Sequence, residues 1–111
     1  MHITFKSQKL AKTLSSEKTL KRQFKADLAA FIKRRMMVLK AAPTLASVSY
    51  LPPERRHQLK GPSKIRFAVD LKHPYRVVFE PNHNPLPLRE NGGLDLEKIT
   101  AITIVAIEDY H

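Results

Sequence analysis

The sequence contains no cysteine and no tryptophan, and only three of its 111 residues are glycine. Without cysteine there is no disulfide framework, no thiolate metal site and no cysteine nucleophile. No apolar run approaches the ~20 residues of a membrane-spanning helix, and the first residues lack the apolar stretch of a signal peptide. We therefore expect a soluble, cytoplasmic protein whose residues 1–111 form a single domain around one hydrophobic core.

Other motifs that would indicate phosphate binding, nucleophilic catalysis or metal binding are also missing. The chain has no glycine-rich phosphate-binding loop and no serine flanked by glycines. Its five histidines, at positions 2, 57, 73, 83 and 111, show none of the short paired spacings that zinc sites use. We expect neither a metal nor a cofactor.

Acidic residues are half as numerous as basic ones. Twenty Lys and Arg against ten Asp and Glu give a formal net charge of +10. Residues 1–42 contain eleven basic and two acidic side chains (+9), residues 43–79 seven and two (+5), and residues 80–111 two and six (−4). Such an excess is typical of proteins with a polyanionic partner, and a basic surface that serves only solubility is the alternative.

The first part of the chain predicts a short strand followed by helices. Residues 2–6 alternate, which indicates a strand, and Ser7 can cap a short helix that ends near Leu14. Ser15-Ser16-Glu17 offers another N-cap, and after it the apolar residues recur at three- and four-residue spacing, which predicts one long amphipathic helix or two abutting ones. A break is expected near residues 25–27, where Asp27 can cap the second segment. Arg35 falls inside the apolar stripe, and we expect it to be a structural, snorkelling or carboxylate-paired arginine.

The second part predicts strands. Residues 57–60, 64–71, 75–80 and 99–109 each have strand character, with a turn at 72–74, a loop at 81–93 and a helical turn at 95–98. In the last strand, strict alternation would put Ile102, Ile104 and Ala106 on one face and Thr103, Val105 and Ile107 on the other. The fold class that follows is α+β, with the N-terminal strand and a helical hairpin packed on a mostly antiparallel sheet of four to five strands.

Two groups of side chains could take part in a reaction, namely cations on the predicted strands and a cluster at residues 108–111. The cations are Arg55, Arg56, Lys60, Lys64, Arg66 and Arg76, and the cluster is Glu108, Asp109, Tyr110 and His111. If the two groups meet, imidazole and phenol can move protons while the cations stabilise a phosphorane, which suits RNA cleavage without metal. The alternative is that Tyr110 and His111 are a frayed end and that the cations only coat the sheet.

Several segments resemble a known family. They are Ile3-Thr4-Phe5-Lys6, Leu59-Lys60-Gly61 followed by Lys64, His73-Pro74-Tyr75-Arg76-Val77-Val78-Phe79-Glu80-Pro81, and Ile107-Glu108-Asp109-Tyr110-His111. Their order resembles the HigB-type toxins of the RelE/ParE superfamily, over essentially the whole chain. Proteins of this sort are sometimes labelled killer-suppression proteins.

The resemblance implies a RelE/ParE-like fold and a toxin of a type II toxin–antitoxin system. Such a toxin is a ribosome-dependent endoribonuclease that cuts mRNA, and its partner is a helix-turn-helix, HigA-like antitoxin. By position, His111 would be the acid/base, and Tyr110 and Asp109 would position it or the RNA. Lys64 and Arg76 would bind the scissile phosphate. Lys60, Arg66, Arg55 and Arg56 would bind RNA, with Arg66 the weaker candidate because the sequence around it departs from the family pattern.

Two other functions are compatible with the same sequence. One is a ParE-like toxin that poisons DNA gyrase and needs no acid/base pair. The other is a non-catalytic module that binds the ribosome or a nucleic acid.

Overall fold

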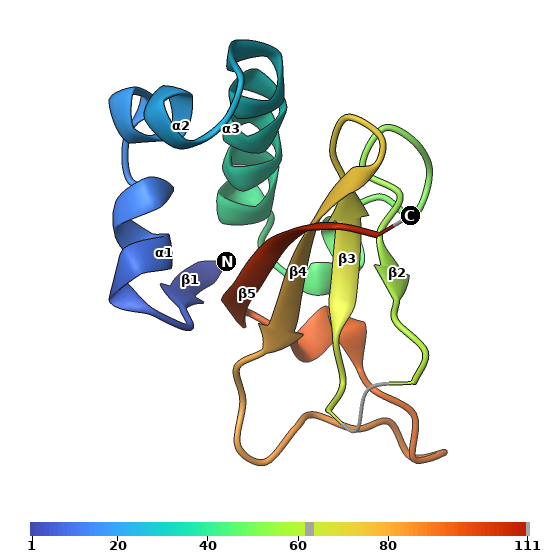
Figure 1. The fold of residues 1–111 in the computed structure, drawn as a ribbon. Helices are drawn as coiled ribbons and strands as arrows, with labels where there is room; N and C mark the ends of the chain where they lie inside the picture. The colour runs from blue at the N-terminus through green and yellow to red at the C-terminus, as the bar shows by residue number, and fades with distance from the viewer. Residues whose placement is uncertain (62–63, 111) are drawn as a thin grey trace.

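The N-terminal part of the chain forms one strand and three helices. Figure 1 shows a computed structural model, which describes residues 1–61 and 64–110. The elements are β1 (His2–Phe5), α1 (Gln8–Thr13), α2 (Glu17–Gln23) and α3 (Ala26–Ala41). The Oγ atoms of Ser7 and Ser16 accept hydrogen bonds from backbone N–H groups of α1 and α2, so both predicted serine caps are confirmed. Across the described ranges, no helix is long and apolar enough to cross a membrane.

The break between α2 and α3 is confirmed, but the predicted cap is wrong. Lys25 is the N-cap residue of α3, and its side chain makes no capping hydrogen bond. Asp27 lies inside the first turn, where a carboxylate is still favourable because of the helix dipole. The Oδ2 atom of Asp27 forms an ion pair with Lys72. The hydrogen bond from Lys72 holds the pKa of Asp27 below its usual value.

The remaining strands complete a five-stranded mixed sheet. They are β2 (His57–Gln58), β3 (Phe67–Asp70), β4 (Tyr75–Pro81) and β5 (Ala101–Asp109), with short 3-10 turns η1 (Leu45–Ser47) and η2 (Leu96–Lys98). The strand order is β1-β5-β4-β3-β2. β1 runs parallel to β5 and all other neighbours are antiparallel. The α+β class is therefore confirmed, with β2 and β3 shorter than the sequence pattern predicts.

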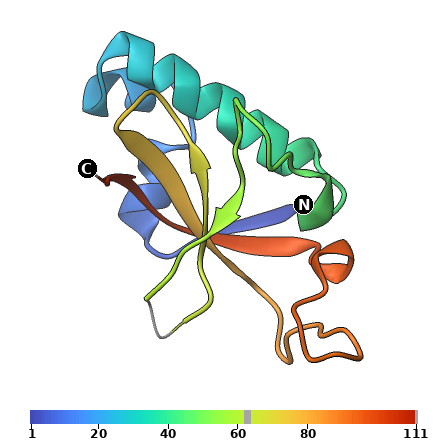
Figure 2. The same cartoon turned by 90° about the vertical axis from the view of Figure 1, so that its right-hand side faces the viewer.

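The core lies between α3 and one face of the sheet. In both Figure 1 and Figure 2, α3 lies on the same side of the sheet as α1 and α2. Phe67 and Phe79 stack on the core face with ring centroids 6.0 Å apart. Other large buried side chains of the core are Ile32 and Leu39 of α3, Leu45, Val48, Val69 of β3, Val77 of β4, Ile99, and Ile102 and Ile104 of β5.

A β-bulge at Val105 changes which side chains of β5 face the core. Val78 pairs with Ala106, but the next residue, Phe79, pairs with Ile104, so Val105 has no partner on β4. The extra residue reverses the alternation of the strand. Ile107 therefore packs against the core together with Ile104. The expectation that Ala106 shares a face with Ile104 is wrong for this reason.

Arg35 is a structural residue, as expected, but its partners are backbone carbonyls and not carboxylates. Its side chain belongs to α3 and is buried, with the residue only 5% exposed. Nε donates to the carbonyl oxygen of Asp70 (2.7 Å) and Nη2 to that of Pro53 (3.3 Å). These bonds connect α3 to the end of β3 and to the loop before β2.

We expect Arg35→Met to destabilise the fold by about 1–3 kcal/mol, because the apolar side chain leaves two backbone carbonyls without their donor. Urea denaturation of both variants measures the difference. The matched control is Arg34→Met. The exposed Arg34 guanidinium lies 4.7 Å from the Phe31 ring, and its removal should lower the free energy of unfolding by less than about 1 kcal/mol. Equal losses in the two variants would contradict this role for Arg35.

Candidate functional site

The sheet face away from the core is lined by small side chains flanked by charges. Ala68 (0% exposed) and Val78 (1%) pair across β3 and β4, and Val78 pairs with Ala106 of β5. Alternation puts the charged residues at both ends of this row on the same face. We call this surface the open face, and its members are Arg66, Ala68, Asp70, Arg76, Val78, Glu80, Ala106 and Glu108.

Two of its arginines are paired with carboxylates on the neighbouring strand. Arg66 Nε lies 2.9 Å from Glu80, and Arg76 Nη2 lies 2.6 Å from Glu108. These side chains are between a fifth and two fifths exposed, so water and ligands can reach them. The pairs neutralise the face in part and fix the position of each guanidinium.

A third arginine reaches the open face from the loop before β2. Arg55 binds Asp70 with two hydrogen bonds, Nε to Oδ2 at 2.6 Å and Nη2 to Oδ1 at 3.0 Å. The hydrogen bonding with Asp70, and to a smaller degree contact with Tyr110, raise the pKa of Arg55. Arg55 has a φ of 46°, in the left-handed region that costs a non-glycine residue about 1 kcal/mol or more. The Arg55 backbone N–H donates a hydrogen bond to the Leu51 carbonyl oxygen (2.9 Å), which helps to hold this conformation.

Tyr110 lies at the end of the open face, where it meets a guanidinium and an imidazole. The Arg76 guanidinium carbon is 4.7 Å from the centre of the Tyr110 ring. The His73 ring meets Tyr110 edge-on, with centroids 6.0 Å apart and planes at 87°. The Tyr110 N–H donates to the Pro74 carbonyl (3.1 Å), which ties this residue to the β3–β4 turn. We call Arg55, His73, Arg76, Glu108 and Tyr110 the Tyr110 cluster.

His73 is the member that the sequence pattern does not indicate. The pattern predicts a turn at residues 72–74 and gives the imidazole no role. A signal was present, because pairing β4 antiparallel to β5 brings the turn before β4 next to the residues that follow β5. The ion pair between Lys72 and Asp27 also fixes this turn against α3.

The other predicted cations do not all join this cluster. Arg66 lies opposite Glu80 of β4. Glu80 and Arg76 are four residues apart on β4, which is about 13 Å at the usual rise of a strand. Lys64 lies further along and lines a cavity with Glu80 and His83. Lys60 is exposed near the same end of the sheet. Lys64 and Arg76 therefore lie toward opposite ends of the open face.

Arg56 is turned away from the open face. Its Nη1 donates to the Leu45 carbonyl at 3.3 Å, and burial lowers the pKa of its guanidinium. Asp109 is exposed and pairs with Tyr75 across β4 and β5. His111, the expected acid/base, lies outside the described residues.

The Tyr110 cluster has the groups for anion binding and proton transfer. Guanidinium groups bind phosphate oxygens in a fixed geometry, and a phenol or an imidazole can donate or accept a proton. Among residues 1–61 and 64–110, no group of three His, Asp or Glu side chains could hold a metal ion.

No family model, no curated protein and no solved structure matches the chain.

We expect Glu108→Gln to increase affinity for a single-stranded RNA oligonucleotide, because Arg76 loses its competing carboxylate. One additional phosphate contact steepens the plot of log affinity against log salt by roughly 0.7. Fluorescence anisotropy across a NaCl series measures this slope. Glu90→Gln, in an exposed loop, changes the net charge equally and should leave the slope nearly unchanged. The same response in both variants would show that Arg76 does not contact RNA.

Proposed function

We propose that this protein is the toxin of a type II toxin–antitoxin system, a ribosome-dependent endoribonuclease that cuts mRNA without a metal. The observation that supports the proposal most directly is the Tyr110 cluster, where a phenol lies against both the Arg76 guanidinium and the His73 imidazole. The net charge of +10 and the resemblance to HigB-type toxins support it independently.

The proposed reaction is an in-line displacement at phosphorus. The 2′-hydroxyl loses its proton and its oxygen attacks the adjacent phosphorus, while the bond to the 5′-oxygen breaks and that oxygen takes up a proton. The products are a 2′,3′-cyclic phosphate and a 5′-hydroxyl. His111, which follows Tyr110 in the sequence, exchanges these protons, and Tyr110 and Asp109 position it or the RNA. Arg76 leaves Glu108 and binds the non-bridging oxygens as their charge grows.

The remaining cations of the open face extend the site along the RNA. Arg55 lies beside Tyr110 and contacts the phosphate next to the scissile one. Lys60, Lys64 and Arg66 lie at the other end of the face and contact flanking nucleotides. This assignment moves Lys64 from the scissile phosphate to a neighbouring one, because about 13 Å of strand already separates Arg66 from Arg76.

The proposed partners follow from charge and from the resemblance. The basic helical layer, with a net charge of +9 over residues 1–42, contacts ribosomal RNA phosphates, and this binding weakens steeply with salt. A HigA-like, helix-turn-helix antitoxin holds the toxin inactive until it is degraded. Both partners require the protein to work in the cytoplasm.

We expect purified protein added to a reconstituted translation reaction to cut the mRNA, with cleavage sites mapped by primer extension. His111→Ala and Arg76→Ala should each lower the cleavage rate by about 10²–10⁴, roughly 3–5 kcal/mol of barrier, and Tyr110→Phe should also lower it. The matched controls are His2→Ala and Arg89→Ala, which remove the same side chains elsewhere and should cut at the wild-type rate.

Three outcomes would contradict the proposal. A His111→Ala variant as active as the wild type would remove the assigned acid/base. Uncut mRNA with the protein bound to the ribosome would identify a non-catalytic binding module. DNA-damage signalling on expression, without translation arrest, would instead identify a gyrase poison.

A further inference from the structure

A cavity lies at the opposite end of the open face from the Tyr110 cluster. Its volume of about 390 Å³ is in the range of cavities that hold small ligands. The antiparallel pairing of β3 and β4 brings two loops to this end of the sheet, the loop before β3 and the loop after β4 (Figure 1). The residues that line the cavity are Lys64, Ile65, Glu80, Pro81, His83 and Leu86. We call this feature the loop cavity.

Glu80 gives the loop cavity a carboxylate that is held in place. It belongs to the open face, and its Oε2 accepts a hydrogen bond from Arg66 Nε at 2.9 Å. Its side chain is still 21% exposed, so a ligand can reach it. A carboxylate can accept about four hydrogen bonds, and the bond from Arg66 therefore leaves capacity for N–H donors of a ligand.

The His83 ring in the lining of the cavity is also held in place. Its Nε2 accepts hydrogen bonds from the backbone N–H groups of Thr100 (3.1 Å) and Ala101 (3.3 Å), where β5 begins. Aromatic rings of proteins stack on the unpaired bases of single-stranded RNA. The apolar side chains of Ile65 and Leu86 add contact area for such a base.

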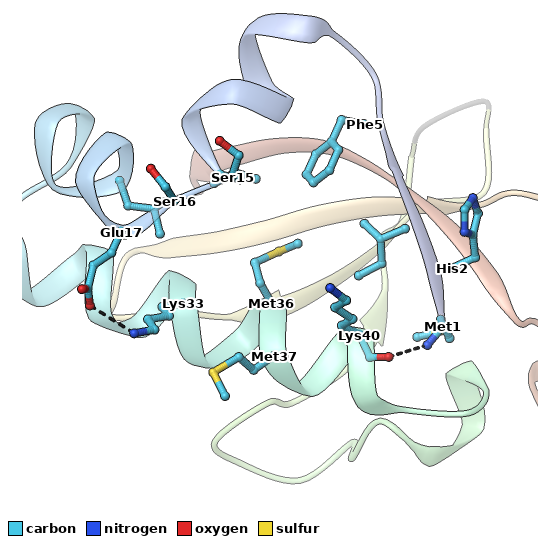
Figure 3. A pocket seen from close by; sticks show the side chains of 13 residues that line it. Met1, His2, Phe5, Ser15, Ser16, Glu17, Lys33, Met36, Met37 and Lys40 are labelled. Carbon is cyan, nitrogen blue, oxygen red and sulfur yellow. Dashed lines mark hydrogen bonds and ion pairs between the residues drawn. The ribbon is translucent and has the colours of Figure 1, made fainter.

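A larger cavity, between β1, the α1–α2 junction and α3, lacks this fixation of its carboxylate (Figure 3). Its volume is about 510 Å³, and its carboxylate belongs to Glu17. Glu17 pairs with Lys33 at 3.1 Å, but both side chains are more than half exposed. An ion pair with this exposure holds its side chains only weakly. The loop cavity is therefore the better candidate for a site that recognises a base through fixed polar groups.

We propose that the loop cavity binds a guanine base of the mRNA. The Watson–Crick edge of guanine presents two adjacent donors, N1–H and the N2 amino group, and both donate to the Glu80 carboxylate. Adenine, cytosine and uracil each offer one donor group at this edge. The purine ring stacks on the His83 ring, and exposed Lys64 binds a phosphate of the same strand.

The guanine belongs to a nucleotide that flanks the scissile linkage. Glu80 is four residues from Arg76 on β4, about 13 Å at the usual rise of a strand. In the proposed reaction Arg76 binds the scissile phosphate, so the base in the loop cavity is part of a neighbouring nucleotide. This inference rests on the proposed function because it assigns the guanine to mRNA, but binding of the base requires no cleavage.

The test measures binding by the full chain without a ribosome. Fluorescein-labelled uridine oligonucleotides that contain one central guanosine, inosine, adenosine or cytidine are titrated by fluorescence anisotropy. We expect the guanosine oligonucleotide to bind about fivefold or more tightly than the adenosine and cytidine ones, because these lose the bidentate contact. Inosine, which lacks the N2 amino group, should give an intermediate affinity. Guanosine monophosphate should compete far more weakly than the unlabelled guanosine oligonucleotide.

Variants of the chain locate the binding. Glu80→Gln should reduce the preference for guanosine over adenosine to less than about twofold, because the amide replaces one acceptor oxygen by a donor. The readout is a ratio of affinities, so a general gain in RNA affinity when Arg66 is released does not change it. The matched control Glu97→Gln removes the same charge at an exposed position of η2 and should keep the wild-type preference.

A second pair of variants tests the apolar wall of the cavity. Leu86→Ala should weaken binding of the guanosine oligonucleotide, because it removes contact area for the base. Leu88→Ala, at a leucine of the same loop that is 57% exposed and outside the cavity, should bind as the wild type does. Circular dichroism verifies that every variant is folded.

Equal affinity for the guanosine and adenosine oligonucleotides would overturn the inference, and so would an unchanged preference in Glu80→Gln. Competition by guanosine monophosphate as strong as that of the oligonucleotide would make a free nucleotide the ligand and would also overturn it. A guanosine preference that depends on Glu80, together with uncut mRNA in reconstituted translation, would contradict only the proposed nuclease function. Cleavage of mRNA without that preference would refute only the guanine site.

Discussion

The candidate site depends on the single extra residue in β5. Without the bulge at Val105, the register set by Phe79 and Ile104 would continue, and Ile107 would lie opposite Arg76. Glu108 and Tyr110 would then face the core, and the open face would receive an isoleucine. The bulge instead keeps Ile107 in the core and puts Glu108 beside Arg76, with the Tyr110 ring over the same guanidinium.

Asp70 at the end of β3 joins the parts of the fold that surround this site. Its carboxylate binds Arg55, its carbonyl accepts from buried Arg35, and its N–H donates to the Glu54 carbonyl. One residue thereby connects α3, the loop before β2 and the open face. Its position explains how Arg55 is held in a left-handed conformation with its guanidinium near Tyr110.

The distribution of charge separates two surfaces with different partners. On the open face, each of Arg55, Arg66 and Arg76 is paired with a carboxylate, so an incoming phosphate must compete for its guanidinium. In the helical layer the lysines far outnumber the acids. In the proposed function, the open face contacts the mRNA and the helical layer contacts ribosomal RNA phosphates.

Local patterns in the sequence determined the element types, the serine caps of α1 and α2, the break before α3 and the α+β class, because these depend on neighbours a few residues apart. They also singled out Arg76, Arg55 and Tyr110 as candidates, by residue type. Only the tertiary structure decided that His73 joins them, that Lys64 lies at the far end of the face and that Arg56 turns away. Those outcomes depend on contacts between segments far apart in the chain, strand pairing for His73 and Lys64 and the Leu45 carbonyl for Arg56, and local patterns do not determine such contacts.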